Sequence, residues 1–419
     1  MVMLKEASIT VNDIEAAAEV LKSISLRTPL QLHKNLSKRF GSEVYLKRED
    51  LQVVRSYKIR GAYNMIQSLD QMQRNKGVVC ASAGNHAQGF AFACRNLNIR
   101  GVVYMPTITP KQKINQVKMF GGDNIEIILV GDTFDECQDH ALEHVQKNDM
   151  VFIPAFDDIK IIAGQGTVGI EILEDLKNID YLFIPIGGGG LCAGIGLYFK
   201  AKSPNTKIVG VEPEGAPSMH EALKAGKPVR LEKMNRFVDG AAVRKIGKIC
   251  YEICKDILSD VLLVPEGKIC TTILQLYNED AIVVEPAGAL TISVLDQYAD
   301  KIKGKRIVCV ISGGNNDIDR MQEIKERSLL YEGLKHYFLI RFVQRPGALK
   351  DFVNNILGPN DDIVRFEFTK KNSKESGPAM IGIEVKSKED FESLIKRMEQ
   401  HNLNYTLVNQ NETLFEYMV

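Results

Sequence analysis

The first residue that could do chemistry is a lysine set among small residues. Lys58 lies in the run 56–62, Ser-Tyr-Lys-Ile-Arg-Gly-Ala, at the start of a segment that predicts a helix. A lysine amine held in a partly desolvated pocket has a lowered pKa, and it can form a Schiff base with an aldehyde cofactor. Because most lysines are solvated surface residues, this interpretation depends on the motifs that accompany Lys58.

A turn of small residues is the second motif. The run 81–89, Ala-Ser-Ala-Gly-Asn-His-Ala-Gln-Gly, follows the predicted strand Val78 to Ala81 and opens a helix predicted from Ala87 to Arg95. Such a turn presents free backbone N–H groups to an anion such as a carboxylate. An ordinary turn capped by a side chain remains the alternative, and we interpret His86 as structural rather than as a general base. The candidate residues are Ser82, Ala83, Gly84, Asn85 and His86.

A glycine loop is the third motif, and it directly follows the predicted strand Tyr181 to Ile186. Without Cβ atoms, such a loop can wrap a phosphate with its backbone N–H groups. The run is not a Walker A loop, because no Gly-Lys-Ser/Thr follows it. Glu212 lies near the spacing of a ribose-binding acid, so a dinucleotide site and a plain glycine hinge remain alternatives. The loop comprises Gly187, Gly188, Gly189, Gly190 and Leu191.

The fourth motif is Ser312, in the run 311–315, Ile-Ser-Gly-Gly-Asn. It closes the predicted strand Ile307 to Ile311. A serine hydroxyl at the carboxyl end of a sheet strand can face the ring nitrogen of a ligand. By itself the run indicates only a turn.

Apolar, β-branched runs bounded by glycine or polar residues must position these motifs. Most of them are followed by helix-like stretches, and runs buried on both faces suit a parallel sheet covered by helices. We therefore expect an α/β fold. The runs are Val44–Leu46, Val78–Ala81, Gly101–Met105, Ile125–Val130, Tyr181–Ile186, Ile208–Val211 and Ile307–Ile311.

The pattern changes after about Met321. We expect a catalytic unit over residues 1–325, a linker helix over 326–336, a small domain over 337–411 and a tail over 412–419. The small domain has the predicted order βαββαβ, which is typical of a ferredoxin-like α+β fold.

Composition excludes several classes of protein. The 419 residues include 53 basic and 53 acidic residues, so the chain has no net charge to attract nucleic acid or an anionic membrane. No apolar stretch reaches the ~18 residues of a membrane span, and the chain begins without a signal-peptide pattern. We expect a cytoplasmic protein whose eight scattered cysteines are buried, reduced thiols.

Taken together and in this order, the four motifs resemble those of pyridoxal-phosphate enzymes of the tryptophan-synthase-β type, called fold type II. The chain looks most like the biosynthetic threonine deaminases (threonine ammonia-lyases) that carry one C-terminal ACT-like domain. The resemblance implies a two-lobed catalytic unit with pyridoxal 5'-phosphate between the lobes, the smaller lobe spanning roughly residues 55–155. It also implies that Lys58 holds the cofactor aldehyde and that Asn85 contacts the pyridine 3-oxygen.

Further roles follow from the same resemblance. Gly187 to Leu191 would wrap the phosphate, Ser312 would face the pyridine nitrogen, and the turn 82–86 would hold the substrate carboxylate. The implied reaction converts L-threonine, with L-serine as a second substrate, to a 2-oxo acid and ammonia. With threonine the product is 2-oxobutanoate, in the first committed step of isoleucine biosynthesis.

The C-terminal domain implies feedback regulation. Its run 345–349, Arg-Pro-Gly-Ala-Leu, resembles the turn into the first helix of ACT-like domains, which bind small amino acids. The implied effectors are isoleucine and valine, and the implied assembly is a homotetramer. Alternatives are a serine dehydratase or a threonine synthase on the same scaffold and, more remotely, a non-catalytic amino-acid sensor.

Two departures from related enzymes narrow the interpretation. Serine racemases place a serine before the Gly-Asn-His, where this chain has Ala83, so racemisation is not expected. Those relatives also bind a divalent cation through Glu-x-x-x-Ala-x-Asp, whereas this chain ends the motif with Ser218, and we predict no metal site. The role of Glu285 stays open between a place near the cofactor ring and an ordinary helix cap.

Overall fold

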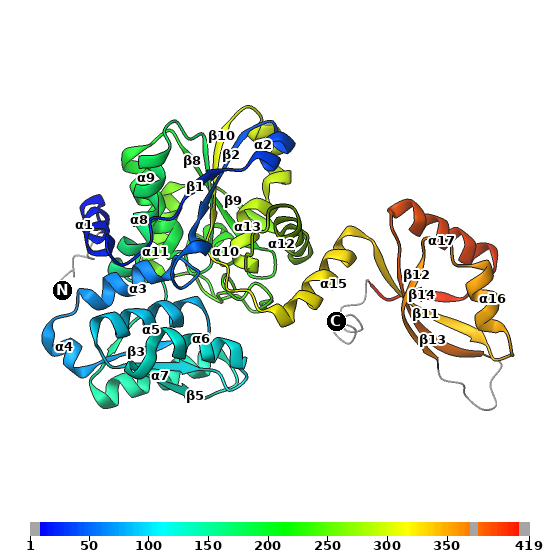
Figure 1. The fold of residues 1–419 in the computed structure, drawn as a ribbon, viewed down its shortest axis with the longest axis horizontal. Coiled ribbons are helices and arrows are strands. Elements are labelled where there is room, and N and C mark those ends of the chain that lie inside the picture. Colours follow the sequence, from blue (N-terminus) through cyan, green and yellow to red (C-terminus); the bar gives the residue numbers. More distant parts are fainter. Residues whose placement is uncertain (1–8, 369–375, 410–419) are drawn as a thin grey trace. The chain divides into compact units, whose positions relative to one another are not determined.

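The computed structural model describes residues 9–368 and 376–409, and it divides into two compact units, residues 1–317 and 318–419 (Figure 1). Each unit has its own buried core. The predicted tail at 412–419 lies outside the described residues.

A six-stranded sheet forms the centre of the first unit. Its order is β1-β2-β10-β7-β8-β9, and every neighbouring pair is parallel except β1 with β2. The sequence predicts β2, β7, β8 and β10, but not β1, which has only three residues, or β9, whose run begins Leu-Ser-Asp. The strands are β1 (Leu30–Leu32), β2 (Glu43–Arg48), β7 (Tyr181–Pro185), β8 (Lys207–Pro213), β9 (Leu258–Val264) and β10 (Arg306–Ile311).

A second, smaller parallel sheet has the order β5-β4-β3-β6, and the helices that follow its strands form the smaller lobe. Strands β3 and β4 are buried along their whole length, as their continuous apolar runs predict. The elements of this lobe are β3 (Val78–Ala81), α5 (Asn85–Leu97), β4 (Gly101–Met105), α6 (Lys111–Gly121), β5 (Ile125–Leu129), α7 (Phe134–Asn148) and β6 (Val151–Phe152).

Close helix packing connects the two lobes. Helix α8 (Ile159–Asp175) packs against α3 (Lys58–Gln67) on one side and α9 (Gly190–Lys202) on the other. A Cβ atom at Gly164 would lie 2.6 Å from the carbonyl oxygen of Arg60, and one at Gly194 would lie 2.6 Å from the backbone nitrogen of Gly166. Only glycine allows these approaches, so α8 fixes the start of α3 relative to the start of α9.

The remaining helices of the first unit connect these elements, and one of them, α4, leads into β3 of the smaller sheet. They are α1 (Val11–Leu21), α2 (Lys34–Phe40), α4 (Gln71–Lys76), α10 (Ser218–Ala225), α11 (Lys248–Ile257), α12 (Glu266–Asp280), α13 (Pro286–Ser293) and α14 (Ala299–Ile302), with 3-10 turns at Glu49–Leu51, Gly122–Asn124 and Leu295–Tyr298, and a further 3-10 turn, Ile318–Arg320, begins the second unit. No described helix is both long and apolar enough to cross a membrane.

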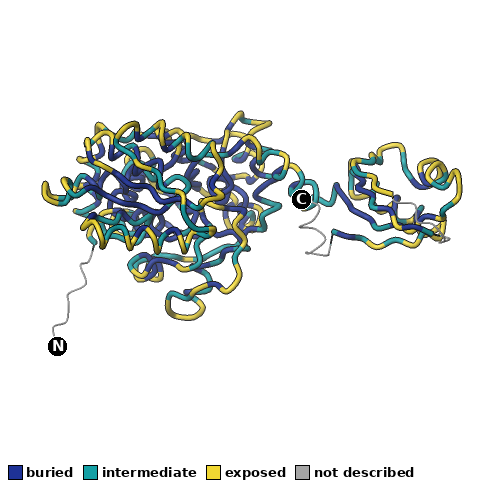
Figure 2. The backbone as a smooth tube through the Cα atoms, turned by 90° about the horizontal axis from the view of Figure 1, so that it is seen from below, coloured by how far each residue is buried: buried dark blue, intermediate teal, exposed yellow. Residues whose placement is uncertain are grey.

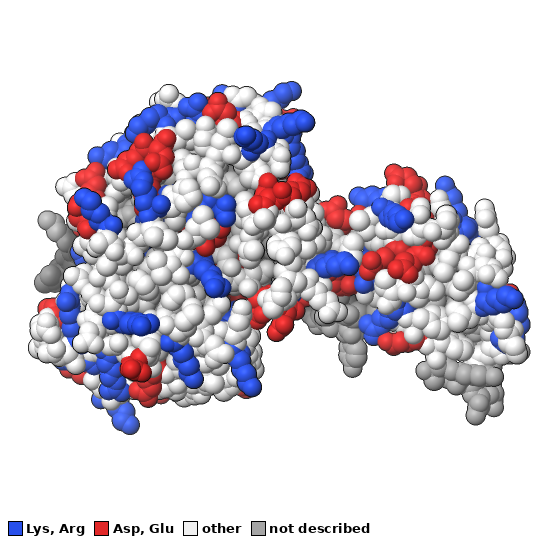
Figure 3. All heavy atoms as spheres, in the orientation of Figure 1, with Lys and Arg blue, Asp and Glu red and all other residues white. Residues whose placement is uncertain are grey.

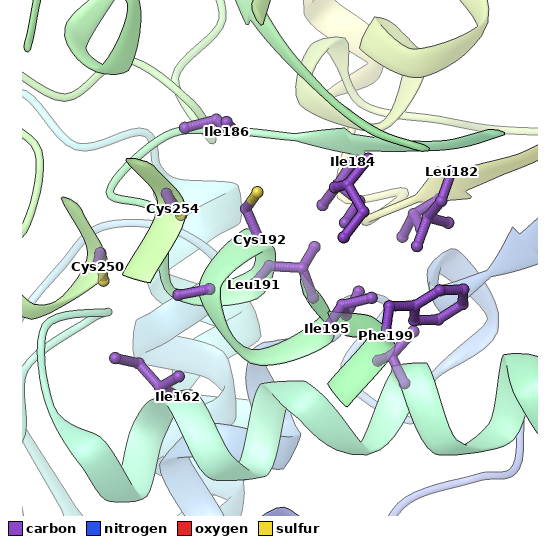
Figure 4. Close-up of a cluster of buried hydrophobic side chains, with 14 of the residues drawn as sticks. Ile162, Leu182, Ile184, Ile186, Leu191, Cys192, Ile195, Phe199, Cys250 and Cys254 are labelled. Carbon is purple, nitrogen blue, oxygen red and sulfur yellow. The ribbon is translucent and has the colours of Figure 1, made fainter. Parts of the chain in front are cut away.

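The core of the large sheet is aliphatic. Side chains from β7 and α9, among them Leu182, Ile184 and Phe199, interdigitate beside α8 (Figure 4). Figure 2 shows the same organisation along the chain, with buried stretches inside and exposed ones at the periphery. All eight cysteines are buried and free, which confirms the prediction.

The second unit has the predicted element order. After α15 (Met321–Glu332) come β11 (Lys335–Val343), α16 (Ala348–Asn355), β12 (Asp362–Phe368), β13 (Ser376–Glu384), α17 (Lys388–Gln400) and β14 (Tyr405–Leu407). The sheet is antiparallel, in the order β12-β13-β11-β14. The sequence pattern predicts that Pro346 lies in the first turn of the helix after β11, but α16 begins two residues later, because Gly347 takes a positive φ of 86° at its N-cap.

Candidate active site

The site forms at the carboxyl ends of two neighbouring strands. The glycine loop follows β7 and Ser312 follows β10, and these strands pair in parallel. The backbone N–H of Tyr57 donates to the carbonyl oxygen of Ser312 at 3.1 Å, which places the start of α3 against the end of β10. The fold thus brings together three motifs that lie more than 100 residues apart in sequence. Open α/β sheets typically bind ligands outside the carboxyl ends of their strands.

Lys58 is the first residue of α3, and its side chain is half-buried. Its Nζ donates to the carbonyl oxygen of Ala155 at 2.6 Å. In the described part of the chain no carboxylate pairs with this amine. Burial lowers the pKa of Lys58 to about 8, so a substantial share of the amine is neutral near physiological pH. A neutral amine is the nucleophilic form.

The glycine loop makes a cradle at the start of α9. A Cβ at Gly187 would lie 2.9 Å from Cα of Ala241, a Cβ at Gly188 would overlap the ring of Phe156, and Gly189 has a φ of +94°. Gly189 is the N-cap, and no side chain caps the helix, so its first N–H groups point out of the helix end. Leu191 packs its side chain into the core (Figure 4), which leaves only its backbone for a ligand.

A second helix start without a side-chain cap belongs to α5, which begins after Gly84. Ser82 does not cap it, since its Oγ accepts from the N–H of Gly84 at 3.2 Å. A Cβ at Gly84 would meet no atom within 4 Å, so the turn borders open space. The arrangement can hold a carboxylate by backbone N–H groups.

His86 holds α5 in place. Its buried Nε2 forms a 2.9 Å hydrogen bond with the carbonyl oxygen of Ile153. Burial, with a smaller contribution from Lys58, lowers the pKa of His86 to about 3, so the ring is neutral and Nε2 donates. This geometry agrees with the interpretation of His86 as structural.

Asn85 takes part in a chain of side chains from three elements. Its Nδ2 donates to Oε1 of Glu285 at 2.7 Å, and its Oδ1 accepts from Nδ2 of Asn315 at 2.6 Å. Glu285 occupies the N-cap position of α13, yet its side chain makes no capping bond. Burial, with a contribution from Asp239, raises the pKa of Glu285 to about 7. Sequence reasoning does not single out Asn315, although it closes the Ser312 motif.

An ion pair joins the two lobes beside the site. Nζ of Lys113, on α6, lies 2.5 Å from Oδ2 of Asp239. Asp239 belongs to the segment 237–241, whose Ala241 contacts Gly187 of the glycine loop. The pair therefore connects the smaller lobe to the wall of the cradle.

Glu212 serves α10 rather than the site. Its carboxylate accepts from the backbone N–H groups of Met219 and His220 at 2.7 and 2.9 Å, and from Oγ of Ser218 at 3.2 Å. Burial raises the pKa of Glu212 to about 7. Its oxygens are committed to the helix start, which disfavours a ribose-binding role. Within residues 9–368 and 376–409, no group of three His, Cys, Asp or Glu side chains is arranged to hold a metal ion.

Comparison with known proteins gives consistent matches over both units. Residues 22–313 match the family model for pyridoxal-phosphate dependent enzymes, and residues 326–418 match the model for the C-terminal regulatory domain of threonine dehydratase. The chain is 58% identical over 412 residues to a biosynthetic L-threonine dehydratase of Halalkalibacterium halodurans, covering 98% of this chain and 99% of that protein. It is 54% identical to the Bacillus subtilis counterpart, covering 100% and 99% of the two chains.

Solved structures agree with the sequence matches. The processed form of threonine deaminase isoform 2 from Solanum lycopersicum is 43% identical, with a TM-score of 0.72 over 76% of this chain and 87% of that one. A maize serine racemase is 29% identical, with a TM-score of 0.72 over 78% of this chain and 100% of that one.

Proposed function

This chain belongs to the family of pyridoxal-phosphate-dependent enzymes, in the branch that carries the threonine dehydratase regulatory domain, and we propose that it converts L-threonine to 2-oxobutanoate and ammonia. The observation that carries the proposal is the Lys58 amine, which has no carboxylate partner among the described residues, in a unit that also presents two helix starts without side-chain caps. One helix start suits a phosphate, and the other suits a substrate carboxylate.

The residues of the site fit pyridoxal 5'-phosphate. In our assignment the backbone of Gly187 to Leu191 would hold the phosphate, and Lys58 would hold the aldehyde carbon. Asn85 would face the 3-oxygen and Ser312 the ring nitrogen. A Cβ on Gly187 or Gly188 would crowd the cradle wall, and the uncapped N–H groups of α9 complement a dianion. When bound, the cofactor supplies an electron sink next to the substrate α-carbon.

The chain's own residues then bind the substrate and move a proton. Backbone N–H groups of the turn 82–86 hold the threonine carboxylate at the start of α5. With the substrate amine in place of Lys58 at the cofactor, Nζ of Lys58 would be a free amine, and burial, which lowers its pKa to about 8, favours the neutral form that would take the proton from the α-carbon. Loss of the β-hydroxyl as water gives an enamine, and its hydrolysis consumes one water and releases ammonia and 2-oxobutanoate.

The second unit supports regulation of this reaction. Its match to the regulatory domain of threonine dehydratase and its ferredoxin-like order favour binding of a small amino acid. In our proposal isoleucine inhibits and valine opposes it, the enzyme works in the cytoplasm as a homotetramer, and the reaction commits threonine to isoleucine synthesis. Allostery requires that the effector bind active and inactive states with different affinity.

A product assay tests the activity. The purified protein with bound cofactor should be yellow, and borohydride should fix the cofactor on the peptide that contains Lys58. Incubation with L-threonine should yield 2-oxobutanoate, and with L-serine pyruvate at a different rate. Product from O-phosphohomoserine instead of L-threonine would identify a threonine synthase, and no turnover of any of these would favour a sensor.

A truncation tests the regulation. A chain ending at Asp317, the last residue of the first unit, should keep threonine turnover and lose its response to isoleucine. Inhibition that persists in the truncated protein would contradict the assignment of the second unit.

A further inference from the structure

We propose that Asn315 and Glu285 are positioning residues that lock the Asn85 amide in one orientation, with one N–H left to face the cofactor's ring oxygen. This inference rests on the proposed function, because it assumes a pyridoxal phosphate ring at Asn85. It assigns a role to Asn315, which the sequence motifs do not explain.

The direction of the hydrogen-bond chain is set at a backbone carbonyl. Nδ2 of Asn315 lies 2.9 Å from the carbonyl oxygen of Val54 and 2.6 Å from the Asn85 side chain. A carbonyl oxygen only accepts, so the atom of Asn315 that faces it must be the amide nitrogen. Val54 lies four residues before Lys58, and its carbonyl therefore ties the chain to the segment that leads into α3.

The same nitrogen fixes Asn85. Both N–H groups of Asn315 Nδ2 are then used, one toward Val54 and one toward Asn85. If Asn85 were flipped, two amide nitrogens would face each other as donors without an acceptor. Asn85 must therefore present its Oδ1 to Asn315 and its Nδ2 to the other side.

Glu285, at the other end of the series of hydrogen bonds, requires the same orientation of the Asn85 amide. Nδ2 of Asn85 lies 2.7 Å from Oε1 of Glu285, which accepts when the carboxyl group is ionised. Glu285 is buried, with only 5% of its surface exposed, so water does not compete for this oxygen. An amide has two N–H groups and one carbonyl oxygen, and these two partners use one N–H and the oxygen. One N–H remains for a ligand.

A low-dielectric setting makes such a chain stiff. Each hydrogen bond is electrostatically stronger away from water, and a buried donor left without an acceptor destabilises the fold. The two hydrogen-bond partners of Asn85 belong to the large lobe, since Asn315 follows β10 and Glu285 precedes α13. Asn85 itself begins helix α5 of the smaller lobe. The orientation of the ring-facing donor thus depends on contacts between the lobes.

A double-mutant cycle tests the proposal. Asn315→Asp keeps the shape of the side chain but replaces the amide nitrogen, which donates to two acceptors, by a carboxylate oxygen that cannot donate. We expect this variant to lower the affinity of the apoprotein for pyridoxal phosphate roughly tenfold, and to shift the visible absorption band of the bound cofactor. Titrations of the full-length chain, run at about pH 8 so that Glu285 is ionised, measure both quantities.

The cycle separates positioning from independent contributions. In an Asn85→Ala background, Asn315→Asp should have no further effect on affinity or on the band, because Asn315 acts through Asn85. The matched control is Asn124→Asp, in an exposed pair with Asn98, which should change neither. Losses that multiply in the double variant would overturn the proposal.

A second variant tests the other hydrogen-bond partner of Asn85, and measurements of folding accompany every variant. Glu285→Ala removes the acceptor at the other end, and it should show the same lack of effect in the Asn85→Ala background. Circular dichroism and thermal unfolding report whether each variant is folded. If the wild-type chain neither binds pyridoxal phosphate nor makes 2-oxobutanoate, the proposed function fails. If it does both while the cycle is additive, only the positioning role fails.

Discussion

Helix α3 carries two cationic side chains that differ in whether a carboxylate pairs with them. One of them, Arg60, belongs to what we call the buried charge cluster, Lys47, Glu49, Arg60 and Glu171. Arg60 contacts Glu49 at 2.8 Å and Glu171 at 2.6 Å, and Lys47 contacts Glu171 at 2.5 Å. The other is Lys58, two residues before Arg60 on the same helix. The amine of Lys58 has no carboxylate partner among the described residues.

The contrast shows in the pKa values. Burial alone would raise the pKa of Glu49, but Arg60 and Lys47 hold it below its ordinary value, so the carboxylate stays ionised. Burial lowers the pKa of Lys58 to about 8 and raises that of Glu285 to about 7, because no oppositely charged group among the described residues lies close enough to either to compensate. Buried charge therefore marks a reactive group here only where the charge is left without a partner. Paired charges instead hold the helix that carries the reactive group.

The largest expected effect comes from removing the unpaired amine. Lys58→Ala should lower threonine turnover roughly 10³-fold or more, since the variant loses both the attachment point and the base. It should not lower the unfolding temperature of the apoprotein, because a partly desolvated amine without a carboxylate partner adds no ion-pair stability. Product assays and calorimetry measure the two. A destabilised Lys58→Ala protein would break the comparison.

Removing a paired charge should have the opposite signature. Glu49→Gln keeps the side-chain shape but leaves the buried Arg60 short of one partner, which should lower the free energy of unfolding by about 3 kcal/mol. Denaturant unfolding measures this change, and the folded fraction should retain turnover. Glu174→Gln, which loses only an exposed contact with Arg27, is the matched control and should stay within about 1 kcal/mol of the wild type.

Ser312→Asp sharpens the comparison by adding a charge to the site. Ser312 is buried at the end of β10, and a carboxylate there would favour protonation of the ring nitrogen. A neutral serine leaves that nitrogen unprotonated in our hypothesis, which favours prompt elimination over transamination. We expect the rate of elimination to fall roughly 10- to 100-fold, and assays of 2-oxobutanoate formation measure this rate. Full retained activity would contradict the hypothesis.

The pH dependence of stability tests whether Glu285 is unpaired. Its pKa of about 7 in the folded protein exceeds the ordinary 4.5, so the folded state holds a proton that the unfolded state has released. Stability should therefore fall as pH rises from about 4.5 to 7, and Glu285→Gln should remove that part of the profile. The charged groups that act on it are Asp239, which raises the pKa, and Lys113, which lowers it. Identical profiles for wild type and variant would mean that Glu285 is ionised throughout.

The smallest effect concerns the ion pair between the lobes. Lys113 and Asp239 are both partly exposed, so Lys113→Met should change stability by less than about 1 kcal/mol. We expect a few-fold higher KM for threonine, because the smaller lobe then closes less readily over the cradle. Steady-state kinetics at low and high salt measure it, and the wild type in high salt should approach the variant.

Local patterns in the sequence predict the strand ends and the turns of the site. Strands β3, β4 and β10 are continuous apolar runs, and the glycine loop follows β7 as its spacing predicts. The short strands β1 and β6 give no such signal, because two or three residues cannot establish a period. The contacts of Asn85 with Glu285 and Asn315 join residues 200 and 230 positions apart, and nothing in the local pattern reports such pairs.

The burial of Arg60 is another feature that local sequence does not report. Arg60 follows Lys58 by two residues, and it is 1% exposed and contacts Glu49 in the buried charge cluster. Its partner Glu171 comes from the distant helix α8. On the face drawn in Figure 3, by contrast, Lys and Arg intersperse with Asp and Glu.

The eight buried thiols of the first unit can report when the protein around them opens. Cys80, Cys94 and Cys137 lie in the smaller lobe, five others lie in the rest of the first unit, and residues 318–419 contain none. A thiol-alkylating reagent would modify each cysteine only when the lobe that buries it opens. The second unit has no cysteine and would not be modified. Mass spectrometry of labelled peptides over time would then give separate opening rates for the two lobes, with and without ligand, from the unaltered protein.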